Sequence, residues 1–151
     1  MKLSDKEENS SHRALIFGPP KAGKTCLAGS LANEFDLIVF DLENGSSSLR
    51  SLPAYLHSKI EVVSLPDTRS YPIAIETMLK VIKGSSVEIC ETHGKVSCAV
   101  CKKSSAPVIL LELNTLPAST VVIVDSLTQL TNSAISYITK GKPDDYNSTS
   151  G

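Results

Sequence analysis

One segment near the N-terminus has the residue types and spacing that bind phosphate. It reads Gly18-Pro19-Pro20-Lys21-Ala22-Gly23-Lys24-Thr25 and fits the pattern G-x-x-x-x-G-K-[ST] at every fixed position. The two glycines let the backbone curl so that successive N–H groups face phosphate oxygens. Lys24 places a positive charge on the β- and γ-phosphates, and the Thr25 hydroxyl is suited to ligate Mg²⁺. The segment, together with Cys26 that follows it, predicts a nucleoside triphosphate site.

Acidic residues at the ends of two apolar runs could complete this site. Val121 to Val124 are apolar and Asp125 follows, which is typical of a strand whose aspartate holds Mg²⁺ through water. Hydrolysis also needs a group that orients or deprotonates the attacking water. Asp41 and Glu43 both follow the apolar run 37–40, and either could face the γ-phosphate, because parallel sheets place ligands at this edge. For both acids, a solvated loop carboxylate that caps the next helix is the alternative.

A cluster of potential metal ligands lies in the second half of the chain, at Cys90, His93, Cys98 and Cys101. C-x-x-H and C-x-x-C pairs at this separation are typical of the Cys₃His tetrahedron that holds a structural Zn²⁺. A closed set of four ligands leaves no open position for chemistry. Two alternatives remain: reduced residues without a metal, or a redox dithiol at Cys98 and Cys101.

Lysines at 83, 95, 102 and 103 surround this cluster and make the segment locally basic. The charge favours contact with single-stranded nucleic acid or with a protein partner. The segment has no aromatic side chain for base stacking, which weakens the nucleic-acid interpretation. A solvated charged face is the simpler alternative.

Composition sets the broad class of the protein. The 151 residues are 41% hydrophobic and 21% charged, with a net charge of −1, as in an ordinary single globular domain without an overall basic field. The N-terminus is polar, and no apolar run is long enough to span a bilayer. We therefore expect a cytoplasmic protein that does not contact membranes.

The order of the expected elements predicts an α/β fold. We expect strands at 13–17, 37–40, 60–65 and 120–125. We expect helices at 24–35, 46–57 with a break at Pro53, 72–83, 108–116 and 126–140, of which 108–116 is ambiguous with strand. Alternating strands and helices indicate a parallel, three-layer sheet. The expected organisation is a flexible end at 1–12, a core at 13–141 with a zinc-binding insertion at 85–106, and a flexible tail at 142–151.

The phosphate loop, the sequence F-D-L-E-N at 40–44 and V-I-V-D-S-L-T-Q-L-T at 122–131 together resemble the RecA-like ATPase core. The resemblance covers about residues 13–140 and implies a three-layer RecA-like P-loop fold that binds ATP and Mg²⁺. It identifies Glu43 as the catalytic glutamate, beside Lys24 and Asp125. Within that superfamily the chain looks most like the phage-encoded Sak-type single-strand annealing ATPases.

This narrower resemblance implies a role in single-stranded DNA recombination in a phage-infected or bacterial cell. It also implies single-stranded DNA and a single-strand binding protein as partners, and assembly into a ring or filament.

Two other functions remain as alternatives. The first is a non-hydrolysing interaction module that binds nucleotide and zinc. The second is a P-loop nucleotide kinase, which would need clustered arginines, whereas Arg13, Arg50 and Arg69 are scattered. A GTPase is disfavoured because the sequence lacks an N-K-x-D segment.

Overall fold

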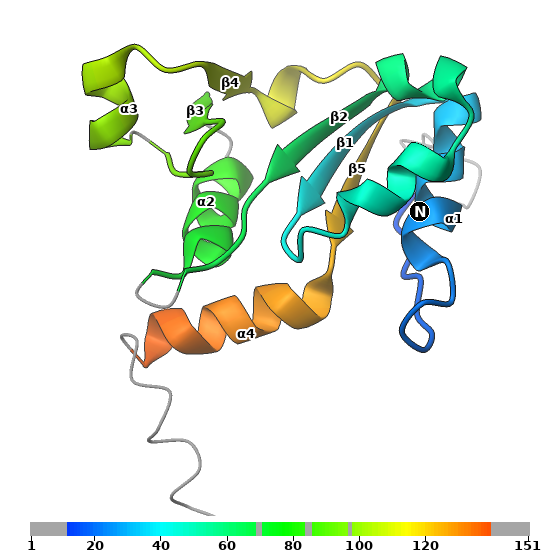
Figure 1. Ribbon diagram of the computed structural model, residues 1–151, viewed down its shortest axis with the longest axis horizontal. Coiled ribbons are helices and arrows are strands. Elements are labelled where there is room, and N and C mark those ends of the chain that lie inside the picture. Colours follow the sequence, from blue (N-terminus) through cyan, green and yellow to red (C-terminus); the bar gives the residue numbers. More distant parts are fainter. Residues whose placement is uncertain (1–11, 69–70, 84–85, 97, 140–151) are drawn as a thin grey trace, which may run out of the picture.

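The centre of the fold is a parallel sheet of three strands in the order β2-β1-β5 (Figure 1). These strands are β1 (Asp36–Asp41), β2 (Ile60–Ser64) and β5 (Thr120–Asp125). Asp41 pairs in register with both Ser64 and Asp125, so the three carboxyl ends finish at one level. All three strands were predicted from their apolar runs and are confirmed.

The computed structural model describes residues 12–68, 71–83, 86–96 and 98–139. The two ends predicted to be flexible, 1–12 and 142–151, lie outside the described residues except for His12. None of the described helices combines the length and the apolar character that crossing a membrane requires.

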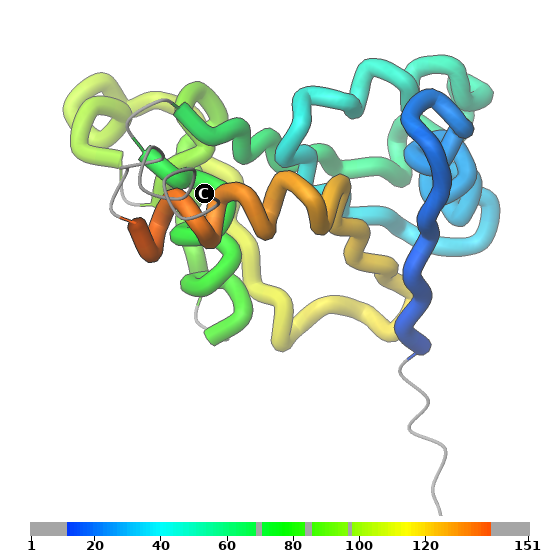
Figure 2. The backbone as a smooth tube through the Cα atoms, turned by 90° about the horizontal axis from the view of Figure 1, so that it is seen from below, coloured from blue at the N-terminus to red at the C-terminus, as the bar shows by residue number. Residues whose placement is uncertain are grey.

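Both faces of the sheet are covered, because the side chains of β1 alternate between two apolar clusters. Ile38 and Phe40 belong to the cluster under α2 (Ile73–Ile82) and α4 (Leu127–Ile138). Leu37 and Val39 belong to the cluster on the opposite face. Short 3₁₀ segments cover that face, at Ser30–Asn33, Ser46–Ser51 and Ala54–Lys59. Figure 2 shows α4 running from the end of β5 toward α2, while the N-terminal segment lies at the other end of the molecule.

Buried polar contacts join α2 to α4. The Ser133 hydroxyl is fully buried, accepts the backbone N–H of Ile75 (3.0 Å) and donates to Asp67 Oδ1 (3.0 Å). The same carboxylate oxygen accepts the backbone N–H of Ala74 (2.9 Å). These bonds satisfy N–H groups in the first turn of α2 that have no partner within the helix.

The predicted helix at 24–35 divides in the structure. It is α-helical as α1 (Lys24–Gly29) and continues as the 3₁₀ segment Ser30–Asn33. Gly29 is the last residue before the helix changes from α to 3₁₀. A Cβ at this position would stand 2.5 Å from Leu49 Cδ2, so the absence of a side chain lets the 3₁₀ segment Ser46–Ser51 pack closely here. The predicted helix at 46–57 is likewise two 3₁₀ segments, which separate around Pro53 as expected.

Two predicted elements are wrong. Residues 13–17 form no strand in the described part of the chain, and Leu15 and Phe17 are 69% and 87% exposed. An apolar run indicates burial, but a strand exists only through a neighbouring strand, which the local pattern does not identify. Residues 108–116 are not helical: β4 (Val108–Leu111) pairs antiparallel with β3 (Val87–Cys90), and a 3₁₀ turn follows at Leu113–Thr115. The partner strand decides between helix and strand for such a short apolar run.

The β3–β4 ribbon and the short helix α3 (Ala99–Ser104) form the predicted insertion. Its expected end at residue 106 falls between α3 and β4, and the ribbon extends to Leu111. Val87, Ile89 and Leu111 belong to the same apolar cluster as Phe40. The insertion therefore shares the main core.

Candidate nucleotide site and metal cluster

The phosphate loop is an exposed turn that leads directly into α1. Lys21 and Gly23 both have left-handed backbone conformations, with φ of 63° and 82°. A Cβ at Gly23 would meet nothing within 4 Å, so this glycine is needed for its φ angle rather than for space. Lys24 Nζ donates to the carbonyls of Gly18 (3.1 Å) and Pro19 (2.9 Å), so the cation folds back over its own loop.

The fold brings together two oxygen donors that lie far apart in the sequence. Thr25 Oγ1 donates to Asp125 Oδ2 at 2.6 Å, from the start of α1 to the end of β5. Hydroxyl and carboxylate oxygens are the ligands that a hard cation such as Mg²⁺ prefers. The donor set therefore fits the predicted Mg²⁺. The thiol of the adjacent Cys26 contacts the carbonyl of Ser48 (3.4 Å), so only the backbone of Cys26 remains available to the loop.

The structure places the two acids that follow β1 in different surroundings. Asp41 is buried, and its carboxylate accepts the backbone N–H groups of Glu43 (3.2 Å), Gly45 (2.9 Å) and Ser46 (3.0 Å). Glu43 is exposed, and its Oε1 accepts the Ser126 hydroxyl, just after β5. The Asp41 carboxylate thus binds the loop backbone, whereas the Glu43 carboxylate contacts a side chain beside the end of β5, the strand that carries Asp125.

The loop after β1 also lies against the rest of the site. The backbone N–H of Leu42 donates to the carbonyl of Asp125 (2.8 Å), and a Cβ at Gly45 would stand 3.9 Å from Asp125 Oδ2. The helix-capping alternative given for both acids anticipated part of the role of Asp41, which accepts the first N–H of the 3₁₀ segment at Ser46, but Asp41 is buried rather than solvated. The available signal was an aspartate followed by Asn44-Gly45, since Asp side chains commonly accept N–H groups two or more residues later.

The four predicted zinc ligands converge. The thiols of Cys90, Cys98 and Cys101 and a ring nitrogen of His93 all lie within 4.8 Å of one another. His93 Nδ1 is 3.2 Å from Cys101 Sγ, 3.7 Å from Cys98 Sγ and 3.9 Å from Cys90 Sγ. Ligands about 2.0 to 2.3 Å from one tetrahedral zinc stand roughly 3.5 to 3.8 Å apart. The spacing and the donor types therefore fit a Cys₃His zinc site.

The thiols of this cluster differ in acidity. A hydrogen bond from the Cys101 backbone to the Cys98 sulfur lowers the pKa of Cys98 to about 6. Burial, followed by the neighbouring thiols, raises the pKa of Cys101 to about 11. In the absence of a cation, a thiolate at Cys98 therefore makes ionisation of Cys101 unfavourable. A bound cation would offset the repulsion between the thiolates, because it stabilises every thiolate that it contacts.

The turn of the metal cluster packs against the end of β2. Gly94, in this turn, has φ of 61°, and a Cβ there would stand 2.6 Å from the carbonyl oxygen of Ser64. The buried Thr77 hydroxyl of α2 donates to the Gly94 carbonyl (3.2 Å). On the other side, Ser64 Oγ donates to Asn44 Oδ1 (3.3 Å) in the loop that carries Glu43. The turn of the Cys/His cluster and the loop that carries Glu43 thus contact the same end of β2.

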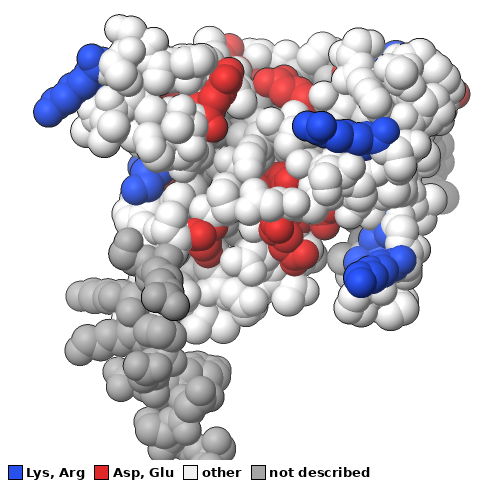
Figure 3. Space-filling view, viewed as in Figure 1, with Lys and Arg blue, Asp and Glu red and all other residues white. Residues whose placement is uncertain are grey.

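The basic residues around the cluster do not form one free cationic surface. Lys95 Nζ lies 4.4 Å from the centroid of the Tyr71 ring, a cation–π contact that uses this charge within the fold. On the face drawn in Figure 3, the blue Lys and Arg side chains stand apart from one another, and acidic side chains gather between them. This face offers no continuous track for a phosphate backbone.

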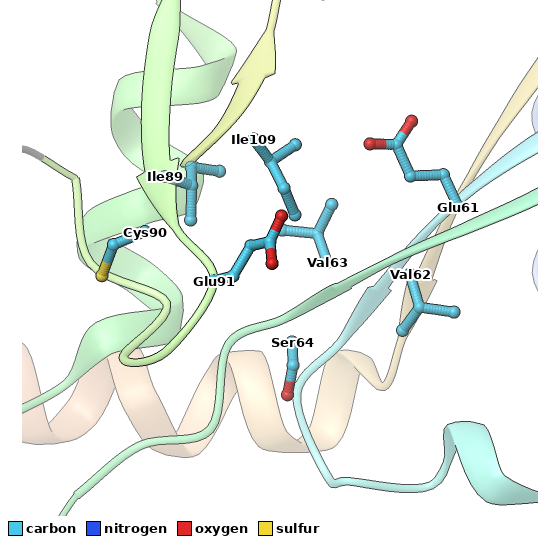
Figure 4. Close-up of a pocket in the computed structure, with 8 residues that line it drawn as sticks. All are labelled: Glu61, Val62, Val63, Ser64, Ile89, Cys90, Glu91 and Ile109. Atoms are coloured by element: carbon cyan, nitrogen blue, oxygen red, sulfur yellow. The ribbon is translucent and has the colours of Figure 1, made fainter. Parts of the chain in front are cut away.

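A cavity of about 340 Å³ lies between the outer edge of β2 and the β3–β4 ribbon, away from the phosphate loop (Figure 4). Figure 4 shows its apolar wall of Val63, Ile89 and Ile109 beside the carboxylate of Glu91. Glu61 also lines it, and its lining contains no Lys or Arg. Two carboxylates without a cation repel a triphosphate, so this cavity does not suit the nucleotide.

Comparison with known proteins places the chain in a family. A family model described as an AAA domain matches residues 10–151, nearly the whole chain. No curated protein and no solved structure matched it. The match includes the phosphate loop, the Thr25–Asp125 contact and the parallel sheet that holds them. The chain belongs to the AAA domain family and is a P-loop ATPase domain of the AAA type.

Proposed function

We propose that this protein binds ATP with Mg²⁺ at the phosphate loop and hydrolyses it. The observation that carries the proposal is the 2.6 Å contact between Thr25 and Asp125, with Glu43 at the same sheet edge. These side chains come from three separate segments and meet beside the loop. A chance match to the loop pattern would not bring them together.

Each residue has a distinct part in the proposed reaction. Lys24 leaves the carbonyls of its own loop and donates to phosphate oxygens instead, while the loop N–H groups hold the rest of the triphosphate. Thr25 and Asp125 would hold Mg²⁺, which neutralises charge on the β- and γ-phosphates when bound. Glu43 accepts a hydrogen bond from the attacking water and orients it toward the phosphorus.

The test is steady-state ATP turnover and ATP affinity in three variants. Lys24→Ala should weaken binding, whereas Glu43→Gln should leave binding within about twofold and reduce kcat about 10²- to 10⁴-fold. Glu88→Gln is the matched control, because Glu88 is an exposed glutamate on β3, away from the loop. Full turnover in Glu43→Gln would remove this residue from the reaction. Tight binding without turnover in the wild-type protein would favour the non-hydrolysing module.

The biological setting that we propose is single-stranded DNA recombination or annealing of the phage type. Its support is the resemblance of two segments, the phosphate loop and D-S-L-T-Q-L at 125–130, to Sak-type ATPases. The expected result is ATP turnover that single-stranded DNA stimulates more than duplex DNA does, with a ring or filament that forms on adding ATP. Light scattering with and without a single-strand binding protein tests the partners. Stimulation by a nucleoside monophosphate instead would favour the kinase.

We also propose that Cys90, His93, Cys98 and Cys101 bind one structural Zn²⁺. The support is the convergence of their donor atoms within 4.8 Å. Elemental analysis should find one zinc per chain, and Co²⁺ substitution should give the absorption spectrum of a tetrahedral thiolate site. Cys98→Ser should lose the metal, whereas Cys26→Ser, a change outside the cluster, should retain it. Equal zinc content in the two variants would contradict the site.

A further inference from the structure

The carboxylate of Asp41 is buried at the end of β1 and is saturated by the loop that follows it. Its relative exposure is 2%. Oδ1 accepts the backbone N–H groups of Glu43 (3.2 Å) and Gly45 (2.9 Å), and Oδ2 accepts that of Ser46 (3.0 Å). Both oxygens therefore accept backbone hydrogen bonds from the loop, and the side chain is buried away from bulk solvent.

The loop held in this way is also anchored at its start, where the backbone N–H of the buried Leu42 donates to the Asp125 carbonyl (2.8 Å). Residues 42–45 are outside any helix or strand, and Asn44 has a left-handed backbone with φ of 57°. A non-glycine residue adopts this conformation only where the surroundings impose it. The Asp41 carboxylate holds the loop from inside, and the Ser64 hydroxyl contacts Asn44 from outside.

We propose that Asp41 is a positioning residue that fixes Glu43 at the nucleotide site through the loop backbone. The proposal deepens the proposed function, because it assigns the two acids after β1 to two different tasks. Asp41 organises the backbone without touching the reacting atoms, and Glu43 faces them. An aspartate is required because three donors meet two acceptor oxygens. An asparagine would place its NH₂ group against one of the N–H groups.

A double-mutant cycle tests this assignment. Asp41→Asn should reduce kcat about 10- to 100-fold, since a misplacement of about 1 Å has effects of this size. It should leave the dissociation constant for ATP within about twofold. Because Asp41 acts through Glu43, the double variant Asp41→Asn/Glu43→Gln should be no slower than Glu43→Gln alone, within about threefold. If the double variant instead lost kcat by the product of the two single reductions, Asp41 would act independently of Glu43, and the proposal would be overturned.

The matched control is Asp36→Asn. Asp36 is an exposed aspartate at the other end of the same strand, so the substitution makes the same chemical change away from the loop. Its kcat and ATP affinity should equal those of the wild-type protein. A loss in Asp36→Asn as large as that in Asp41→Asn would mean that any such change in β1 slows the enzyme, and would overturn the specific role.

Amide hydrogen exchange measures the loop without relying on turnover. In the wild-type protein without nucleotide, the amides of Glu43, Gly45 and Ser46 should exchange at least tenfold more slowly than in an unstructured peptide. In Asp41→Asn they should lose this protection, while the amides of Ile38 and Val39 within β1 keep theirs. Unprotected loop amides in the wild-type protein would overturn the proposal even if the variant failed to fold.

The two measurements separate this proposal from the proposed hydrolysis. If the wild-type protein lacks turnover, or if Glu43→Gln retains it, the proposed reaction fails and hydrogen exchange still decides whether Asp41 holds the loop. If exchange and kcat are both unchanged in Asp41→Asn, the positioning role fails and the proposed hydrolysis is unaffected.

Discussion

Replacing Gly94 with alanine tests how tightly the turn of the metal cluster packs against the sheet. Alanine at φ of 61° costs about 1 to 2 kcal/mol in backbone strain. Its Cβ would also stand 2.6 Å from the Ser64 carbonyl oxygen and 3.3 Å from Leu65 Cα. This backbone cannot easily retreat, because the Leu65 N–H is bonded to the carbonyl of Asp41 (2.9 Å). Overpacking of this kind costs about 1 to 3 kcal/mol.

Replacing glycine with alanine also lowers the conformational entropy of the unfolded chain, which stabilises the folded state by about 0.4 to 1 kcal/mol. The net destabilisation expected for Gly94→Ala is therefore about 2 to 4 kcal/mol. The assay is urea denaturation at a fixed, saturating zinc concentration, with the free energy of unfolding taken from the midpoint and the slope. Zinc content is measured on the same samples.

Gly23→Ala is the matched control, because Gly23 also has a positive φ (82°) but nothing lies within 4 Å of an added Cβ. It should cost only the backbone strain, so Gly94→Ala should be at least about 1 kcal/mol worse. If the two variants lose the same stability within about 0.5 kcal/mol, the close packing of the turn against β2 is refuted. The end of β2 would then not be a tight contact between the Cys/His turn and the loop that carries Glu43.

Three further results are expected. Lys24→Ala should weaken ATP binding about 10- to 100-fold, because a charged hydrogen bond to the phosphates is lost. The control Lys80→Ala removes a cation on α2 and should leave the affinity unchanged. Fluorescence titration with an ATP analogue measures both affinities. In zinc-free protein at pH 7, iodoacetamide should modify Cys98 faster than Cys101. A pKa of about 6 leaves Cys98 mostly as the thiolate, whereas a pKa of about 11 keeps Cys101 protonated. Peptide mass mapping measures the two rates, and their difference should shrink below pH 6. Ser133→Ala should cost about 1 to 3 kcal/mol in urea denaturation, because it leaves the buried Ile75 N–H without its acceptor.

The sequence was sufficient for the elements whose signal is local. The strands at 36–41 and 120–125 each contain four consecutive apolar residues, so their type and position were predictable, although only β1 is central in the sheet. The phosphate loop and the Cys/His cluster were found from spacing alone. The donor atoms of the Cys/His cluster converge because one ribbon with a short helix holds all four residues.

What the sequence could not provide depends on contacts between distant segments. β4 was taken for a helix because its strand character comes from pairing with β3, about twenty residues earlier. The spacing alone did not separate Asp41 from Glu43, and only the resemblance to RecA-like ATPases favoured Glu43. The path of the loop determines which carboxylate meets the backbone N–H groups. The same limitation applies to residues 13–17, where the apolar character was evident but a pairing partner was not.

The apolar cluster that the β3–β4 ribbon shares with Phe40 determines whether the segment that carries the proposed zinc site could fold in another protein. Val87, Ile89 and Leu111 fill space above the central strand, so excising the ribbon would expose Phe40 and Val63 to water. A peptide spanning 85–106 would in turn lack β4 and the apolar surface on which it rests. The four proposed zinc ligands therefore cannot be moved as an independent zinc finger, and a chimera that retains their arrangement must carry β2 and α2 as well.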